Sequence, residues 1–258
     1  MGQTLTRTVV LSSVLLGCSS EHDTRASRQL VNTASVPASS GVSTSSTAPK
    51  EALYFGAGGP WGWLVSLDFD LGQGARYQPL SVVRLCRVRG DSAGNVSWSS
   101  VPDAGVVEQF KGTLDPSGLR GLITWVEEAS ARVTSKVSVD LQPVSANDLS
   151  APEVSGLYSN LHYIQRSGDL TGRDVLILGL GPRPKILITR YEGAPQGPFV
   201  VESLRVSGDT LSGIYRMARV QHFTFIRRGG ELHTLDGGVL QRRAGLLDAL
   251  RPKPQPPC

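Results

Sequence analysis

The chain has 258 residues, of which 40% are hydrophobic and 19% are charged, and its formal net charge is +4 at pH 7. These proportions are typical of a globular protein and exclude a chain that is disordered throughout. Three cysteines are too few for a small disulfide framework, and no basic stripe with interleaved aromatic residues is present. We therefore expect no nucleic-acid partner.

The N-terminal residues have the order of an export signal. One basic residue, Arg7, precedes a short apolar run that ends in Leu15-Leu16-Gly17-Cys18. This run is too short to cross a bilayer as a permanent helix. The four residues resemble the lipobox of bacterial lipoproteins, in which the cysteine is acylated and becomes the N-terminus of the mature protein. The resemblance implies that residues 1–17 are removed and that lipid on Cys18 holds the protein in the membrane. Ser19 at the next position favours the outer membrane, on its periplasmic or surface side.

Residues 18–50 are expected to form the acylated cysteine and a disordered tether. The segment from Ser19 to Lys50 contains 13 Ser or Thr among 32 residues and no aromatic residue. Such a composition cannot bury enough apolar surface to offset the entropy lost on ordering the chain. The folded part is then predicted over residues 51–251, followed by a proline-rich tail at 252–258.

From residue 51 onward, apolar and polar residues alternate in short runs separated by Gly, Pro, Asp and Asn. This pattern predicts strands at 62–71, 80–89, 94–99, 105–114, 119–127, 131–142, 156–165, 174–180, 185–191, 199–206, 211–217, 219–227 and 231–242. One short helix is predicted at 243–250. We expect an all-β fold, an antiparallel meander of about 10 to 13 short strands closed as a barrel or folded into a sandwich.

Two segments of the second half support more detailed predictions. Arg228-Gly229-Gly230-Glu231 predicts a hairpin with a two-residue turn, because glycine accepts positive φ at both central positions. This register pairs Ile226 with His233 and turns three residues to the core, namely Phe223, Phe225 and Leu232. Residues 175–180 and 186–188 are apolar at every side-chain position, which predicts a strand pair covered on both faces.

A tryptophan motif stands at the start of the first predicted strand. Gly59-Pro60-Trp61-Gly62-Trp63 resembles the Gly-x-Trp entry of lipocalins. In that family the tryptophan plugs the closed end of an eight-stranded barrel, and some bacterial members are lipoproteins. The resemblance covers only these five residues, and the chain has more predicted strands than that family.

With Cys18 assigned to lipid, Cys86 and Cys258 remain. In an oxidising compartment they could form a disulfide that fastens the tail to the strands. Alternatively, Cys86 is a small buried hydrophobe and Cys258 a free thiol. We favour the unpaired alternative.

Residues that could carry catalysis or bind a metal are few. The candidates are three pairs, Asp68 with Asp70, His222 with His233, and His162 with Asp169. The two aspartates lack the further oxygen ligands of a calcium loop. His222 and His233 lie too far apart along the predicted hairpin to share one metal ion. His162 and Asp169 could act as an acid/base pair only if a turn brings their side chains together. We therefore expect no metal, no cofactor and no catalytic residue.

The favoured interpretation is an exported, lipid-anchored envelope lipoprotein. Its non-catalytic β domain would bind a ligand or partner, or support envelope structure. The alternative is a secreted hydrolase using a carboxylate pair in a β-barrel cleft, which a cavity with convergent polar groups would favour. A third interpretation, a structural spacer, predicts no pocket. Four tryptophans could anchor a partner or belong to the core, namely Trp61, Trp63, Trp98 and Trp125.

Overall fold

The computed structural model describes residues 51–149, 153–181, 183–245 and 250. These residues form sixteen strands with antiparallel pairing throughout, so the prediction of an all-β antiparallel fold is confirmed. The number of strands exceeds the predicted range of about 10 to 13. Of the helix predicted at 243–250, residues 246–249 lie outside the described residues, and Arg243, at its predicted start, is the last residue of a strand.

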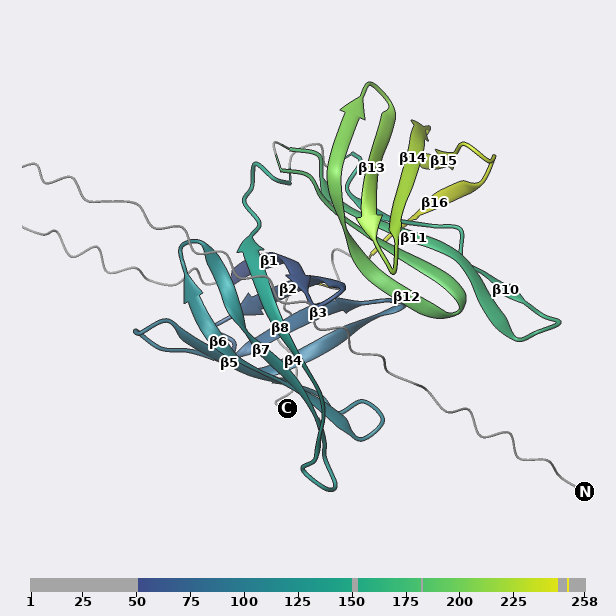
Figure 1. Cartoon of the computed structure of the whole chain (residues 1–258). Helices are drawn as coiled ribbons and strands as arrows, with labels where there is room; N and C mark the ends of the chain where they lie inside the picture. Colours follow the sequence, from purple (N-terminus) through teal and green to yellow (C-terminus); the bar gives the residue numbers. More distant parts are fainter. Residues whose placement is uncertain (1–50, 150–152, 182, 246–249, 251–258) are drawn as a thin grey trace, which may run out of the picture. The chain divides into compact units, whose positions relative to one another are not determined.

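The first eight strands form a closed up-and-down barrel, drawn from purple to teal in Figure 1. They are β1 (Glu51–Gly58), β2 (Trp61–Asp68), β3 (Gln73–Gln78), β4 (Ser81–Gly90), β5 (Asn95–Ser100), β6 (Val106–Asp115), β7 (Gly118–Glu127) and β8 (Val133–Pro143). Each strand pairs with the next in sequence, and β8 returns to pair with β1 through residues such as Gly56 and Leu141. Closure therefore leaves no free edge in this sheet.

Side chains fill the interior of the first barrel. The buried cluster includes Trp63, Val65, Leu67, Leu85, Trp98, Phe110, Leu119, Ile123 and Leu141. The rings of Trp98 and Phe110 stack with their centroids 3.8 Å apart. The interior is therefore a packed core.

The tryptophan motif opens the second strand, which corrects the expectation that it opens the first. Gly58 pairs with Trp61, so Gly59 and Pro60 form a tight connection in which Gly59 has φ +57°. The sequence prediction missed β1 and β3 because the bulky residues of β1 stand in one run, Leu53-Tyr54-Phe55, without alternating with polar ones, and β3 is short and largely polar.

The second sheet is also closed, and it is drawn in teal, green and yellow in Figure 1. Its strands are β9 (Gly156–Ser159), β10 (His162–Ile164), β11 (Asp169–Gly179), β12 (Lys185–Ser207), β13 (Thr210–Arg216), β14 (Val220–Arg228), β15 (Glu231–Thr234) and β16 (Val239–Arg243). β9 pairs with both β11 and β16, which completes the ring. Within the described residues, β10 pairs with β11 alone. The long β12 pairs with β11 through its first part and with β13 through its last part.

The strand pair β11–β12 has buried apolar side chains on both faces, as predicted. Val175, Ile177, Ile186 and Ile188 belong to the core inside the second barrel. The intervening positions belong to a third cluster, which also contains Phe55, Leu64, Ala75 and Tyr77 of the first barrel together with Leu176, Leu178 and Leu187. This strand pair therefore contributes to two hydrophobic cores.

The predicted β14–β15 hairpin is confirmed in register. Ile226 pairs with His233, and Arg228 pairs with Glu231. Gly229 and Gly230 have φ values of +55° and +87°, as the two-residue turn requires. The three residues predicted for the core face, Phe223, Phe225 and Leu232, all lie in the core of the second barrel.

Candidate functional site

A polar pocket of about 190 Å³ opens in the second barrel. Its wall combines residues from β11, β12, the end of β9 and the turn after β15. The lining residues are Asn160, Thr171, Gly172, Arg173, Arg190, Tyr191, Glu192, Thr234, Asp236 and Gly238. Most of these side chains are polar or charged, whereas the core beneath them is apolar.

Two glycines keep this pocket open. A Cβ atom at Gly172, where φ is +125°, would lie 2.8 Å from the carbonyl oxygen of Asn160. A Cβ atom at Gly238 would lie 2.7 Å from Oγ1 of Thr234. Side chains at these positions would displace lining residues, so glycine is required by space at both and by backbone conformation at Gly172.

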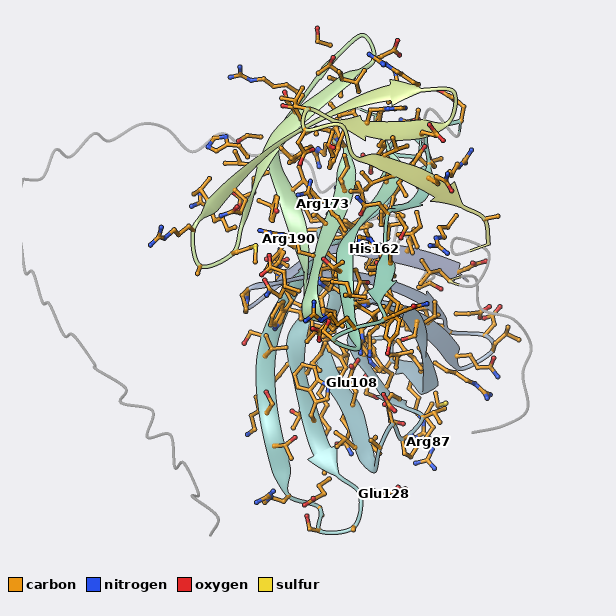
Figure 2. All side chains as sticks on the ribbon, turned by 90° about the vertical axis from the view of Figure 1, so that its right-hand side faces the viewer. Arg87, Glu108, Glu128, His162, Arg173 and Arg190 are labelled. Atoms are coloured by element: carbon orange, nitrogen blue, oxygen red, sulfur yellow. The ribbon has the colours of Figure 1, made fainter. Side chains whose placement is uncertain are left out.

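Arg173 and Arg190 are register partners on β11 and β12, and Figure 2 labels both on the second barrel. Directly opposite residues of an antiparallel pair lie on the same face of the sheet. Both belong to the pocket wall, and both are half-buried. The guanidinium carbon of Arg173 lies 5.9 Å from the centre of the Phe225 ring, which forms part of the core beneath.

The two arginines differ in their partners. Arg190 forms an ion pair with Glu192. Arg173 donates its backbone N–H to Oδ1 of Asn160 at 2.7 Å, but its guanidinium has no hydrogen-bond or ion-pair partner among the described residues. Arg173 is thus a half-buried cation with an aromatic neighbour and no anion in contact.

Asp236 is the second carboxylate of the wall. The hydroxyl of Thr234 holds the pKa of Asp236 below its ordinary value, with help from backbone N–H groups and from the charge of Arg173. A carboxyl with a lowered pKa stays ionised near neutral pH and serves as an acceptor. It is a poor general acid, because that role needs a raised pKa.

The structure does not bring together the pairs considered from sequence. His162 pairs with Thr171 and its ring nitrogen Nδ1 lies 3.1 Å from the carbonyl of Asn160, whereas Asp169 pairs with Ile164. His233 contacts Glu231 at 3.2 Å. Asp68 accepts the backbone N–H of Leu71, as an ordinary turn does. Within the described part of the chain, no group of three or more His, Cys, Asp or Glu could hold a metal ion.

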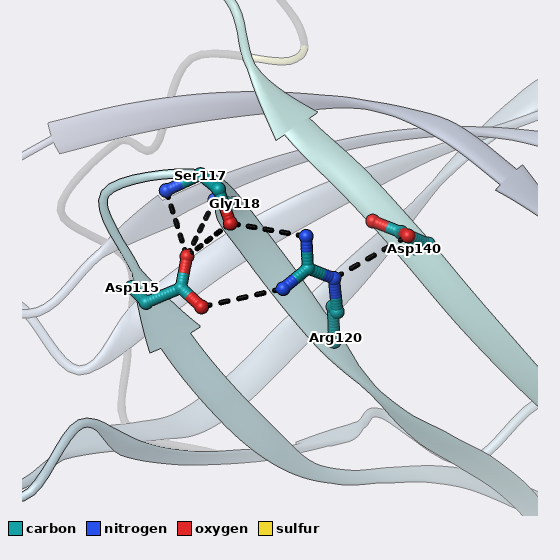
Figure 3. A network of polar contacts seen from close by, with 5 residues as sticks. All are labelled: Asp115, Ser117, Gly118, Arg120 and Asp140. Atoms are coloured by element: carbon teal, nitrogen blue, oxygen red, sulfur yellow. Dashed lines mark hydrogen bonds and ion pairs between the residues drawn. The ribbon is translucent and has the colours of Figure 1, made fainter. Parts of the chain in front are cut away.

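A charged network on the first barrel is a further candidate, shown in Figure 3. Arg120 bridges Asp115 and Asp140, with both contacts at 3.3 Å. Asp115 also accepts hydrogen bonds from Ser117 and Gly118, which close the β6–β7 turn. About half of the Arg120 side chain is exposed, so the network is a solvated turn and lines no pocket described above.

The tryptophans belong mainly to the core. Trp63 and Trp98 are buried and Trp125 is partly buried. Trp61 is 40% exposed, and its ring lies 5.8 Å from that of Phe199 in β12.

The cysteine prediction needs one correction. Cys86 is disulfide-bonded, so the favoured unpaired state is wrong. Cys18 and Cys258 lie outside the described residues, and lipidation of Cys18 stays a prediction. No helix among the described residues is both long enough and apolar enough to span a membrane.

No protein-family model matches this chain. Searches of curated proteins and of solved structures also found no match.

Proposed function

We propose that the chain is an exported, lipid-anchored envelope protein that binds a small polar ligand, without catalysis, in the pocket of its second barrel. The observation that carries the binding role is the half-buried guanidinium of Arg173, which lines a pocket and contacts no acceptor among the described residues. Convergent polar groups in a concave site over an apolar core are typical of ligand-binding pockets.

The anchoring part of the proposal is supported by the sequence Leu15-Leu16-Gly17-Cys18 and by the Ser/Thr-rich segment that follows it. It has a direct test in cells. Wild-type protein should float with membranes and carry the mass of a lipid on Cys18, whereas the Cys18→Ala variant should remain unprocessed and lack that mass. Equal masses and equal flotation of the two proteins would refute the anchor.

The hydrolase alternative has less support from the same pocket. Its two carboxylates are Glu192, which is exposed and paired with Arg190, and Asp236, whose pKa is lowered. The lowered pKa of Asp236 is the opposite of what a general acid requires, and the carboxylate of Glu192 is engaged by Arg190. The spacer alternative predicts no pocket, so the pocket of about 190 Å³ favours binding.

Binding in this pocket can be tested by NMR with isotope-labelled protein. The probes are glucose, glucosamine, glucuronate and glucose 6-phosphate, each of a size suited to a small pocket. At least one probe should shift the backbone signals of Thr171, Gly172 and Gly238. Thr171→Trp should abolish these shifts by filling the pocket, while Thr113→Trp, on an exposed position of β6, should keep them. If no probe shifts these signals, the binding role fails.

A further inference from the structure

We infer that the ligand of this pocket is a small hydroxylated anion, such as a sugar acid or sugar phosphate, whose acidic group binds Arg173. This inference rests on the proposed binding function and names the chemical class of its ligand. It goes beyond that function because a polar pocket could equally hold a neutral sugar.

The first argument is the unpaired donor set of Arg173. A guanidinium carries five N–H donors in a planar fork that matches carboxylate and phosphate oxygens. Arg76, Arg216 and Arg227 each contact a carboxylate in this structure. Arg173 is half-buried, its guanidinium lies over the Phe225 ring, and among the described residues it forms no hydrogen bond or ion pair, although its charge acts on Asp236 in the same wall. No guanidinium nitrogen of Arg173 is enclosed by the protein, so the fork is open to the acidic group of a ligand in the pocket.

The second argument is the position of Arg190. It lies directly opposite Arg173 on the same face of the sheet, and like charges in this arrangement destabilise a strand pair. Glu192 offsets part of the charge of Arg190. An anion bound in the pocket, on the face of the strand pair that carries both arginines, would contact Arg173 and also lower the repulsion between Arg173 and Arg190. The register therefore places two cationic side chains where one anion can act on both.

The third argument concerns the rest of the ligand. Asp236 and Glu192 bring two negative charges to the wall, which balance the charges of the two arginines. A purely anionic ligand such as inorganic phosphate would meet repulsion from these carboxylates. Hydroxyl groups on the ligand would instead donate hydrogen bonds to them. The wall therefore fits an anion at one end and hydroxyl groups at the other.

The experiment compares glucuronate and glucose 6-phosphate with glucose, using calorimetry on the folded protein at low ionic strength. At least one of the two anions should bind ten times more tightly than glucose or better, because charge-assisted hydrogen bonds are roughly twice as strong as neutral ones. Added salt should weaken this preference. The anion that binds more tightly distinguishes a carboxylate from a phosphate ligand.

Arg173→Gln should weaken binding of that anion about tenfold or more, since it removes the charge and the fork. Arg205→Gln, on an exposed arginine of the neighbouring strand β12, should have no effect. The comparison of probes on the wild-type protein stands even if the Arg173 variant fails to fold. Binding of glucose as tight as that of the more tightly bound anion, or unchanged affinity in Arg173→Gln, would overturn the inference. If glucose alone shifts the pocket signals, the binding function survives and the anion inference fails.

Discussion

Arg76 and Glu108 form an ion pair at the wall of the first barrel core. Oε2 of Glu108 lies 2.8 Å from Nη2 of Arg76, while Oε1 accepts a hydrogen bond from Nε. The side chain of Glu108 is only 3% exposed, and the guanidinium carbon of Arg76 lies 5.0 Å from the centre of the Trp63 ring. Removing one member of such a pair leaves a buried charge without its counter-charge.

We expect Arg76→Met to lower the free energy of unfolding by about 3–5 kcal/mol, measured by urea denaturation. The double variant Arg76→Met/Glu108→Leu should recover most of this loss, because no charge then remains buried. Arg120→Met provides the contrast, since the ion pairs of Arg120 are solvated and contribute little. An Arg76→Met variant as stable as Arg120→Met would contradict the structural role of the buried pair.

Buried tyrosines give the protein a predicted sensitivity to alkaline pH. Burial raises the pKa of Tyr54 to about 12. Burial and the charge of Asp174 also raise the pKa of Tyr77, against the opposing effect of a hydrogen bond with Thr189. Burial raises the pKa of Tyr191 as well, and its hydroxyl donates to Asp174 at 2.7 Å. These groups keep their protons in the folded state at pH values where the unfolded chain releases them.

A tyrosine whose pKa is higher in the folded state than in the unfolded state stabilises the folded protein. This stabilisation is complete below the unfolded pKa of about 10 and is lost as the pH rises above that value. We therefore expect the urea concentration at the unfolding midpoint to decrease as the pH rises from 9.5 to 11.5. The phenolate absorbance at 295 nm should appear at a higher pH in the folded protein than in the unfolded chain. Tyr54→Phe should reduce the dependence on pH, while Tyr163→Phe, at an exposed position, should leave it unchanged. A midpoint that stays constant over this range would contradict the prediction.

Among the elements, the close pairing of strands β6 and β7 depends on two glycines. Gly112 and Gly121 are register partners. A Cβ atom at Gly121 would lie 2.4 Å from the carbonyl oxygen of Lys111 and 2.6 Å from Cα of Gly112. It would also press on the ring of Phe110, which stacks on Trp98. Backbone atoms cannot move aside as a flexible side chain can.

Gly121→Ala should therefore destabilise the protein by about 1–3 kcal/mol and change the near-ultraviolet dichroism of Trp98. Gly105→Ala is the matched control, because a Cβ atom there meets nothing within 4 Å and only its positive φ opposes the substitution. The control should leave the tryptophan signal unchanged. Equal tryptophan signals in both variants would contradict the packing role of Gly121.

The sequence predicts elements best where a local rule decides them. The Gly229-Gly230 turn fixes the register of its hairpin, and the apolar residues of β11 and β12 predict coverage on both faces. Strand β1 escapes prediction because its apolar residues do not alternate with polar ones and its second partner, β8, lies far away in sequence. The pocket escapes for a related reason. The predicted strand began at residue 174, one residue after Arg173, and only the β11–β12 register brings Arg173 opposite Arg190.

At the scale of the molecule, the third hydrophobic cluster couples the two barrels. Leu176 in β11 is 1% exposed, and its cluster includes Phe55 and Leu64 of the first barrel. All four tryptophans lie in strands of the first barrel, and only Trp61 has a ring contact with the second barrel, at Phe199, so their fluorescence reports mainly on the first barrel. A substitution in β11 therefore has a readout in a different sheet.

We expect Leu176→Ala to cost about 2–5 kcal/mol and to shift the unfolding midpoint seen by tryptophan fluorescence as far as the midpoint seen by circular dichroism. Coincident transitions would show that the two barrels unfold together. If the fluorescence midpoint stays at its wild-type value while the dichroism midpoint moves, the barrels unfold independently and the coupling is absent.

The two-sided burial of β11 and β12 also bears on how the chain selects one pairing over its neighbours. A strand with one polar face resists slippage, because a shift by one residue would turn that face inward. Apolar residues on both faces remove this protection where residues 175–177 pair with residues 186–188. The adjacent residues Arg173 and Asp174 restore it, because a slip would move the arginine out of the pocket wall and the aspartate away from Tyr191. Arg173, which lines the pocket, thus also helps to fix the alignment of the strands that carry it, together with the buried Asp174.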